Sequence, residues 1–314
     1  MLKSDICDLL SIEYPIFQGG MAWLGTAELA AAVSEGGGLG LIGAGHMPPD
    51  VFRAEIRKLK ERTSKPFGCN IMLMSPFVKE VMDVVVEERV PVITTGAGNP
   101  ATYVPALKEI GTKVIPVVAS VLLAKRLLRG NVDAVIAEGT ESGGHVGSIT
   151  TMALLPQIVD AVDVPVIAAG GIGDGRGMAA AFALGAQAVQ MGTRFVLSEE
   201  CIAHENYKNA VLKAKDRSTV MTGMTTGHPV RILENQLSKQ YQELEFGGTD
   251  KEVLEKLGAG TLKMAAIDGD VKNGSVMIGQ ICGMLDDIKP CAQIIKDIST
   301  EAEMVIKGLQ NRIG

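Results

Sequence analysis

Aromatic residues are scarce in this sequence: the 314-residue chain contains one Trp, four Tyr and seven Phe. Basic residues are also in the minority, since 30 Lys and Arg stand against 36 Asp and Glu and give a net charge of −6. Proteins that bind nucleic acid usually present a basic surface, and those that bind single strands add aromatic side chains for base stacking. The composition therefore argues against nucleic acid and anionic membrane surfaces as partners.

Cysteines are few and scattered along the chain. Their number is odd, and no pair has the spacing of a zinc site or a redox motif. We therefore predict no disulfide framework and no metal site, but free thiols in a reducing compartment. The five are Cys7, Cys69, Cys201, Cys282 and Cys291.

Long hydrophobic runs are missing as well. The longest strand-like apolar run, 114–124, is about half of the ~20 residues needed to cross a bilayer, and lysines bound it. Charged residues (Lys3, Asp5 and Asp8) interrupt the N-terminus where a signal peptide would need its apolar region. We expect no transmembrane segment, no signal peptide and a cytoplasmic location. The sequence leaves a homodimer open.

What the chain does contain, from residue 14 onward, is a repeated unit: a short β-branched run, a Gly- or Pro-bearing loop, and a segment with apolar residues at helical spacing. This pattern predicts alternating strands and helices. The predicted strands are 15–18, 39–42, 67–70, 92–94, 113–117, 134–137, 164–168 and 188–191. The predicted helices are 27–35, 49–62, 78–88, 101–110, 120–128, 153–161 and 177–184, with Ser120 and Asp174 as N-caps.

Eight continuous apolar strands favour an α/β fold of the (β/α)₈ TIM barrel type, because strands buried on both faces show no polar alternation. An open doubly wound sheet is the rival, since Gly38, Gly40 and Gly43 match a dinucleotide-binding pattern. In that pattern, however, the glycines follow a strand and open a helix. Here they end a predicted helix and lie in the next strand, so the pattern does not support a dinucleotide fold.

The repeat stops after the eighth strand. Residues 198–263 are more polar and poor in β-branched runs, which predicts a lid or substrate-binding subdomain. Residues 1–197 and 264–314 then form the barrel, and an amphipathic stretch at 294–309 supplies its last helix.

The loops after the seventh and eighth strands carry glycines where barrels of this kind commonly bind phosphate. Gly170 and Gly171 follow the seventh strand, and Gly192 and Thr193 follow the eighth. Backbone N–H groups in such loops can approach an anion closely, and the Thr193 hydroxyl adds a donor. The alternative is that these glycines serve tight turns alone.

The loop after the sixth strand, 138–147, carries a single histidine, His145. A flexible loop that presents an imidazole above the barrel mouth suits acid–base chemistry, because His titrates near neutral pH. We therefore predict His145 as the catalytic residue. The plainer interpretation is a surface histidine in a Gly-rich loop.

The ends of the first, third and fourth strands carry amides and glycines beside an apolar methionine. Amide and backbone donors next to an apolar side chain match the polar edge of a flavin ring. A buried Asn can equally bond to its neighbours. The residues are Gln18, Gly19, Gly20, Met21, Asn70 and Gly96.

Six segments together resemble one family, the flavin-dependent enoyl-acyl-carrier-protein reductases of type II (FabK type), within the wider nitronate monooxygenase group. They occur in order and cover nearly the whole chain: YPIFQGGMAW, KPFGCNIMLMSPF, TTGAGNP, VIAEGTESGGHVG, PVIAAGGI and AVQMGTRF. The similarity continues through AHENYK, TGHPVR and GDVKNGSVMIGQ. One departure is Ala119, where relatives often have proline.

The resemblance implies an FMN-binding barrel that takes a hydride from NADH or NADPH and reduces the trans-2 double bond of an enoyl thioester on acyl carrier protein. It places Gly170, Gly171, Gly192 and Thr193 at the phosphate and His145 at the reacting atoms. It leaves the choice between NADH and NADPH open. The residues that it places around the flavin are Gly19, Gly20, Met21, Asn70, Gly96, Glu138, Ser142, Gly143 and Gly144.

Three other functions remain as alternatives. A nitronate monooxygenase would share the fold and the flavin but pass electrons to oxygen. An inosine-monophosphate-dehydrogenase-like barrel would need a nucleophilic cysteine on an active-site loop, and none of the five cysteines lies there. A non-catalytic binding barrel would keep the glycine loops but would have no use for His145.

Overall fold

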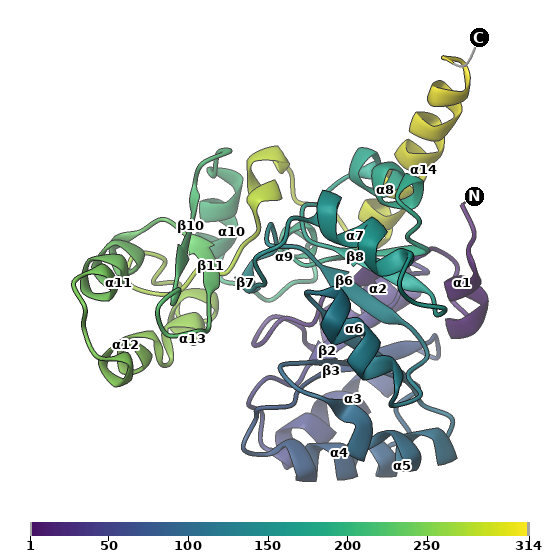
Figure 1. The fold of residues 1–314 in the computed structure, drawn as a ribbon, viewed down its shortest axis with the longest axis horizontal. Coiled ribbons are helices and arrows are strands. Elements are labelled where there is room, and N and C mark those ends of the chain that lie inside the picture. Colours follow the sequence, from purple (N-terminus) through teal and green to yellow (C-terminus); the bar gives the residue numbers. More distant parts are fainter. Residues whose placement is uncertain (1, 313–314) are drawn as a thin grey trace.

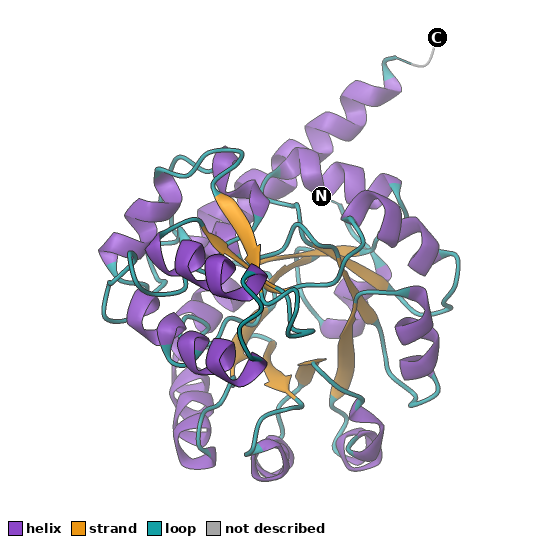
Figure 2. Ribbon diagram, turned by 60° about the vertical axis from the view of Figure 1, so that its left-hand side comes forward, coloured by secondary structure: helices purple, strands orange, loops and turns teal. Residues whose placement is uncertain are grey.

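The computed structural model describes residues 2–312, and its centre is a ring of eight parallel strands (Figure 2). The strands follow one another in the order β1-β9-β8-β6-β5-β4-β3-β2. A bridge between Phe17 and Leu39 joins the first strand to the second, so the ring closes. The α/β (β/α)₈ TIM-barrel prediction is confirmed. The strands are β1 (Ile16–Gln18), β2 (Gly40–Gly43), β3 (Phe67–Met72), β4 (Val92–Gly96), β5 (Lys113–Val118), β6 (Val135–Glu138), β8 (Val166–Ala169) and β9 (Ala188–Met191).

Helices surround this ring. Ser120 accepts a hydrogen bond from the Leu123 N–H at 3.2 Å and Asp174 one from the Gly177 N–H at 3.0 Å, which confirms both predicted N-caps. The helices are α2 (Ala27–Glu35), α3 (Pro49–Arg62), α4 (Val78–Glu87), α5 (Val104–Glu109), α6 (Val121–Leu128), α7 (Thr151–Val159) and α8 (Gly175–Ala183).

One predicted helix differs from the structure. The segment 101–110 is divided into a 3₁₀ turn, η1 (Pro100–Thr102), and the short helix α5. Prolines stand at the first turn of both pieces, where a missing N–H is tolerated, whereas a proline in the middle of one continuous helix would break its ladder.

The dinucleotide interpretation fails in the structure as expected. The Gly38 N–H donates to the Val33 carbonyl at the end of α2, at 3.1 Å, and Gly40 and Gly43 are the first and last residues of β2. The glycines therefore end a helix and form a strand.

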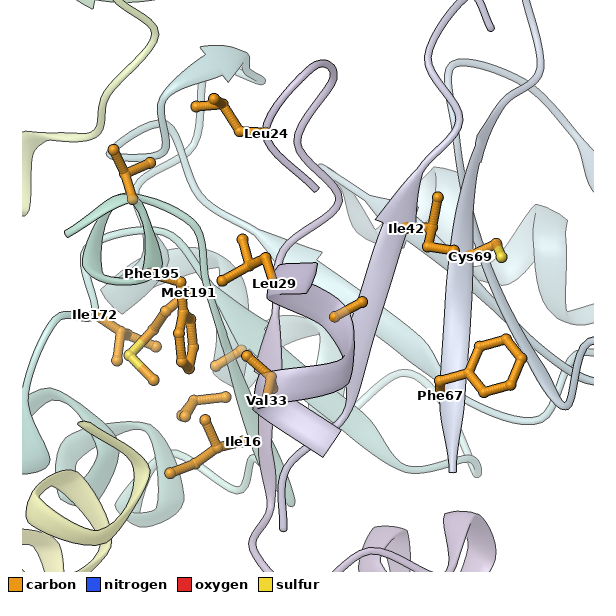
Figure 3. Packing of buried hydrophobic residues seen from close by; sticks show 14 of the residues in the cluster. Ile16, Leu24, Leu29, Val33, Ile42, Phe67, Cys69, Ile172, Met191 and Phe195 are labelled. Atoms are coloured by element: carbon orange, nitrogen blue, oxygen red, sulfur yellow. The ribbon is translucent and has the colours of Figure 1, made fainter. Parts of the chain in front are cut away.

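Two apolar layers hold the barrel together. Side chains such as Phe17, Leu41 and Ile136 fill the interior of the ring, and helix α1 (Asp5–Leu10) adds Ile6 and Leu10 to that cluster. The larger layer lies between strands and helices, where Leu29 and Val33 of α2 face Ile16 and Met191 (Figure 3). The two layers fix the strand ends from which the site is built.

The chain leaves the barrel after β9 and forms a lid with its own small antiparallel sheet (Figure 1). This agrees with a lid inserted after the eighth barrel strand; the exact division at 198 and 264 stays a prediction. The lid sheet consists of β10 (Thr219–Thr222), β11 (Val230–Leu233) and the two-residue β7 (Gly144–His145), which comes from the barrel loop after β6. Other elements after β9 are α9 (Thr193–Val196), α10 (Glu205–Leu212), α11 (Gln236–Phe246), α12 (Lys251–Gly258), α13 (Thr261–Ala266) and η2 (Gln280–Met284).

The last helix, α14 (Cys291–Gln310), returns to the barrel wall and packs against α8 and α2 (Figure 1). Its Glu301 carboxylate accepts a hydrogen bond from the Gly175 N–H at the start of α8, at 2.7 Å. This helix completes the ring of eight outer positions. Within residues 2–312 no helix has the length and apolarity to cross a membrane, and all five cysteines are free and buried.

Candidate functional site

The glycine loops after β8 and β9 lie side by side at the carboxyl end of the barrel, because those two strands pair in register. Gly170 and Gly171 have φ angles of +88° and +71°, a left-handed conformation that glycine adopts without steric cost. Within residues 2–312, the N–H groups of Gly170, Gly171 and Gly192 meet no hydrogen-bond acceptor. Adjacent backbone N–H groups without partners form a concave surface suited to an anion.

Thr193 lies beside these loops but is already engaged. Its hydroxyl oxygen accepts a hydrogen bond from the Gly279 N–H at 2.9 Å, and the residue is buried. The hydroxyl hydrogen is still available to donate. That Thr193 donates a hydrogen bond to the phosphate therefore stays a prediction. Its bond with Gly279 gives it a structural role as well, since it anchors the segment that precedes η2.

The ends of β1 and β3 meet closely, because a Cβ on Gly20 would lie 2.1 Å from Cβ of Asn70. Asn70 is half-buried and donates from Nδ2 to the Thr94 hydroxyl at 2.9 Å, and within residues 2–312 its amide oxygen accepts no hydrogen bond. Met21, which follows β1, lies near the end of β9: its Sδ is 3.6 Å from the position that a Cβ on Gly192 would occupy. A Cβ on Gly96, at the end of β4, would meet no atom within 4 Å.

Gln18 has a structural role that the sequence did not reveal. It is fully buried; its side-chain oxygen accepts from the Leu41 N–H at 2.9 Å, and its amide nitrogen donates to the Gly19 carbonyl. The bond from Leu41 ties β1 to β2. Contact between Gln18 and a cofactor stays a prediction. Gly19 connects the end of β1 to β9 instead, because its N–H donates to the Met191 carbonyl at 2.8 Å.

Glu138 ends β6, and burial perturbs the pKa of its carboxyl strongly. Although part of its surface faces the mouth, desolvation raises the pKa of its carboxyl to about 7, and a hydrogen bond with Ser142 opposes that rise only in part. At neutral pH Glu138 is therefore close to half protonated, and its protonated form can donate a hydrogen bond.

A carboxylate within the loop that follows β6, that of Glu141, holds the loop in place. Glu141 accepts from the Thr151 N–H and hydroxyl at 2.9 to 3.0 Å, which fixes the loop to the start of α7. Gly143 packs so closely on the segment before η2 that a Cβ would lie 2.7 Å from Cα of Ile278. The Gln280 N–H donates to the Glu141 carbonyl at 2.9 Å.

His145 is not on a flexible loop, which corrects the sequence-based expectation. It lies in β7, where it pairs with Val230 of β11, and the next residue, Val146, donates its N–H to the Pro229 carbonyl at 3.1 Å. The expectation failed because a two-residue strand has no periodicity of its own and forms only through pairing with the lid. Gly144 is paired in the same way with Arg231.

The His145 side chain is exposed at the mouth but lies among protein atoms and other histidines. Desolvation lowers the pKa of His145, and the nearby charges of His228 and His46 lower it further. The imidazole is therefore neutral at pH 7, with one nitrogen able to donate and the other to accept.

Arg231 has a structural role at this site that the sequence analysis did not predict. It is buried, and its guanidinium donates twice to the Thr140 carbonyl, at 3.0 and 2.9 Å, and once to the Thr219 hydroxyl at 3.2 Å. It thus joins the lid sheet to the loop that carries His145. Two short apolar runs separated by Gly-rich residues, 219–222 and 230–233, are a hairpin signal that could have indicated this sheet.

Comparisons with known proteins agree with this architecture. The model of the nitronate monooxygenase family matches residues 3–84 and 74–301. The structure of FabK from Thermotoga maritima is 53% identical, covers all of both chains and superposes with a TM-score of 0.97. FabK-type proteins are the type that the sequence motifs resemble.

Two curated relatives carry other names. A probable nitronate monooxygenase of Staphylococcus saprophyticus is 34% identical over 97% of this chain and 99% of its own. A (3aS,4S,5R,7aS)-5-hydroxy-7a-methyl-1-oxo-octahydro-1H-indene-4-carboxyl-CoA dehydrogenase of Mycobacterium tuberculosis is 32% identical over 96% of each chain. The match of the family model over almost the whole length, together with these relatives, shows that the chain belongs to the nitronate monooxygenase family of oxidoreductases.

Proposed function

We propose that this protein is an FMN-dependent enoyl-acyl-carrier-protein reductase that uses NADH or NADPH to reduce the trans-2 double bond of an enoyl thioester. The observation that carries this proposal is the 53% identity to FabK of Thermotoga maritima over the full length of both chains. The staphylococcal relative named as a probable nitronate monooxygenase is 34% identical. The dehydrogenase relative, named for a CoA ester, supports an acyl thioester as the substrate class.

The residues at the barrel mouth fit FMN. The unpartnered N–H groups of Gly170, Gly171 and Gly192 suit a phosphate group. The free side of Asn70, the open space beside Gly96 and the apolar Met21 suit a flat ring with a polar edge. When bound there, the flavin supplies hydride acceptance and hydride transfer.

His145 supplies hydrogen bonding at the reacting thioester. Because its pKa is lowered, its neutral ring N–H donates to the thioester carbonyl oxygen, where negative charge develops when hydride reaches the β-carbon. Delivery of a full proton from an imidazolium is disfavoured at neutral pH for the same reason, so the α-carbon of the resulting enolate takes its proton from water at the barrel mouth. The pairing of β7 with β11 holds the histidine backbone in place for this task.

The proposed substrate carrier is acyl carrier protein, and the proposed setting is the cytoplasm. Five free, buried cysteines agree with a reducing compartment. The regular βα architecture assigns no second dinucleotide-binding domain to residues 2–312, so the nicotinamide would reach the same mouth as the thioester and the two would bind in turn.

The second candidate is nitronate oxidation, which the family match and the staphylococcal relative favour. One comparison separates the two functions. Anaerobic oxidation of NADH and of NADPH is measured with crotonyl thioester, and aerobic oxygen uptake is measured with a nitronate. We expect rapid thioester-dependent oxidation of one nicotinamide. Turnover with the nitronate alone would overturn the reductase proposal and support the second candidate.

A further inference from the structure

A depression of about 580 Å³ lies on the lid and includes none of the barrel-mouth residues described above. It is bounded by the end of α10, the loop 213–218 and the end of β11. Its lining is dominated by charged side chains around a small apolar floor to which Leu233 contributes. The charged residues are Lys213, Lys215, Asp216, Arg217 and Glu234.

The three cations of this depression are exposed, and none of them forms an ion pair within residues 2–312. Of the two acidic groups, Glu234 is paired with Lys239 at 3.4 Å. Three unpaired positive charges therefore surround one unpaired carboxylate, that of Asp216. This arrangement attracts a polyanionic partner.

The segment around the depression is basic, whereas the rest of the chain is acidic. Residues 201–240 contain six Lys and Arg and three Asp and Glu, a local charge of +3. Because the whole chain has −6, the remaining residues carry −9. An acidic protein is repelled by most of this molecule and attracted to this segment.

Internal hydrogen bonds hold the loop of the depression in one shape. The Lys215 N–H donates to the Ser218 hydroxyl at 2.8 Å, and the Glu234 N–H donates to the Ser218 carbonyl at 2.7 Å. Since these amides are occupied, the depression offers side-chain cations rather than the backbone N–H groups typical of a buried phosphate site. Exposed cations on a firm, shallow surface suit a protein partner better than a nucleotide.

Strand β11 connects this depression to His145. Leu233 lies at the depression, and Val230, three residues earlier, pairs with His145. Three residues of strand correspond to about 10 Å. A partner seated at the depression is therefore next to the barrel mouth.

We propose that the surface formed by Lys213, Lys215 and Arg217 is the docking site for the acidic carrier protein that brings the enoyl thioester to the barrel. This inference rests on the proposed function and adds the location of the partner. The carrier binds through long-range attraction to the three cations, and its acyl arm follows the direction of β11 toward His145.

The test is the double charge reversal Lys213→Glu with Lys215→Glu. We expect kcat/KM for enoyl-acyl carrier protein to fall roughly tenfold to hundredfold, with a weaker dependence on salt than in the wild type. An enoyl N-acetylcysteamine thioester, which has neither protein nor phosphate, should react as with the wild type. The matched control, Lys251→Glu with Lys256→Glu, makes the same charge change on α12, which contributes no residue to the depression. It should leave both substrates unaffected.

Measurements with enoyl-CoA and with the nicotinamide distinguish carrier docking from the binding of a nucleotide phosphate. Equal losses with enoyl-CoA and the carrier, or a raised KM for NADPH, would assign the depression to a nucleotide phosphate and overturn the docking proposal. Equal losses with all thioesters, or no loss with the carrier, would overturn it too. A wild type that reduces no enoyl thioester would overturn the proposed function and the docking site together, whereas an active wild type with an unaffected double variant would overturn the docking site alone.

Discussion

The pKa values of two side chains at the mouth, His145 and Glu138, are shifted in the direction that favours the neutral form of each side chain. Desolvation is the main cause in both. For a base, desolvation lowers the pKa; for an acid, it raises the pKa. The mouth therefore presents a neutral imidazole and a partly protonated carboxyl at pH 7. Both can donate hydrogen bonds without carrying a full charge.

Replacing His145 should separate catalysis from cofactor binding. His145→Ala should retain flavin and an unchanged melting temperature, because the strand pairing of β7 uses only backbone groups. Turnover with an enoyl thioester should fall roughly tenfold to a thousandfold. In stopped-flow measurements, reoxidation by the thioester should slow more than reduction by the nicotinamide. Equal slowing of both half-reactions would contradict the assigned role.

The same pair of proteins tests the lowered pKa. Since the imidazole is already neutral above its ordinary pKa of about 6.5, the ratio of wild-type to His145→Ala reoxidation rates should be constant between about pH 7 and 8.5. A ratio that falls through this range would show that an imidazolium is the active form.

Glu138 should lower the stability of the flavin-free protein at alkaline pH. Its folded pKa of about 7 lies above the usual value of 4.5, so the folded state holds a proton that the unfolded state releases between these two values. Stability from this group is thus present below about pH 4.5 and is lost as the pH rises through 7. Glu138→Gln should raise the free energy of unfolding by up to about 3 kcal/mol at pH 8 and by little at pH 4.5. Denaturant titrations of flavin-free protein at both pH values measure this, and equal effects would contradict the raised pKa.

At the level of elements, the sequence predicts the barrel much better than the lid. The eight barrel strands are buried on both faces, so continuous apolar runs such as Val114 to Val118 mark them without any tertiary information. Strand β7 and the contacts of Arg231 depend on pairing between the lid and the barrel loop, which no local pattern records. The glycine loops were predictable, but the bonds of Gln18 and Thr193 were not, because their partners lie far away in the sequence.

The loop after β8 allows a direct test of the phosphate prediction. Gly171→Asp should weaken FMN binding at least tenfold, because it adds a negative charge, beside the Glu141 side chain, to the loop that is predicted to bind the phosphate. The left-handed φ of +71° strains any side chain, so Gly171→Asn is the control: Asn has the same shape and tolerates this conformation but carries no charge. Flavin content and flavin affinity are measured for both. Equal affinities would show that strain rather than charge explains the loss, and full retention of FMN by the Asp variant would exclude phosphate from this loop.

On the scale of the whole molecule, the lid and the barrel are joined through a small number of polar contacts near the mouth. Arg231 is buried, and two of its donors bind the Thr140 carbonyl of the barrel loop. The segment before η2 adds a second connection through Gly279 and Thr193. The position of the lid therefore decides the position of the loop that carries His145.

Arg231→Met should reveal this connection. The Thr140 carbonyl would lose its donor at a cost of about 1–3 kcal/mol. We expect kcat to fall with FMN content unchanged and the lid to become more sensitive to proteolysis, whereas Arg231→Lys should recover part of kcat. If the Met variant loses stability but keeps kcat, Arg231 stabilises the fold without positioning His145.

The membership of His145 in the lid sheet has a consequence for how this family can diverge. The barrel strands position the glycine loops that we predict to bind phosphate, while the His145 backbone is paired to a strand of the lid. Substitutions in the lid are therefore expected to affect both the entry of substrates and the orientation of the His145 side chain. Relatives with names as different as nitronate monooxygenase and carboxyl-CoA dehydrogenase align with this chain over nearly their full length. A change confined to the lid is therefore one way in which a shared barrel can serve different reactions.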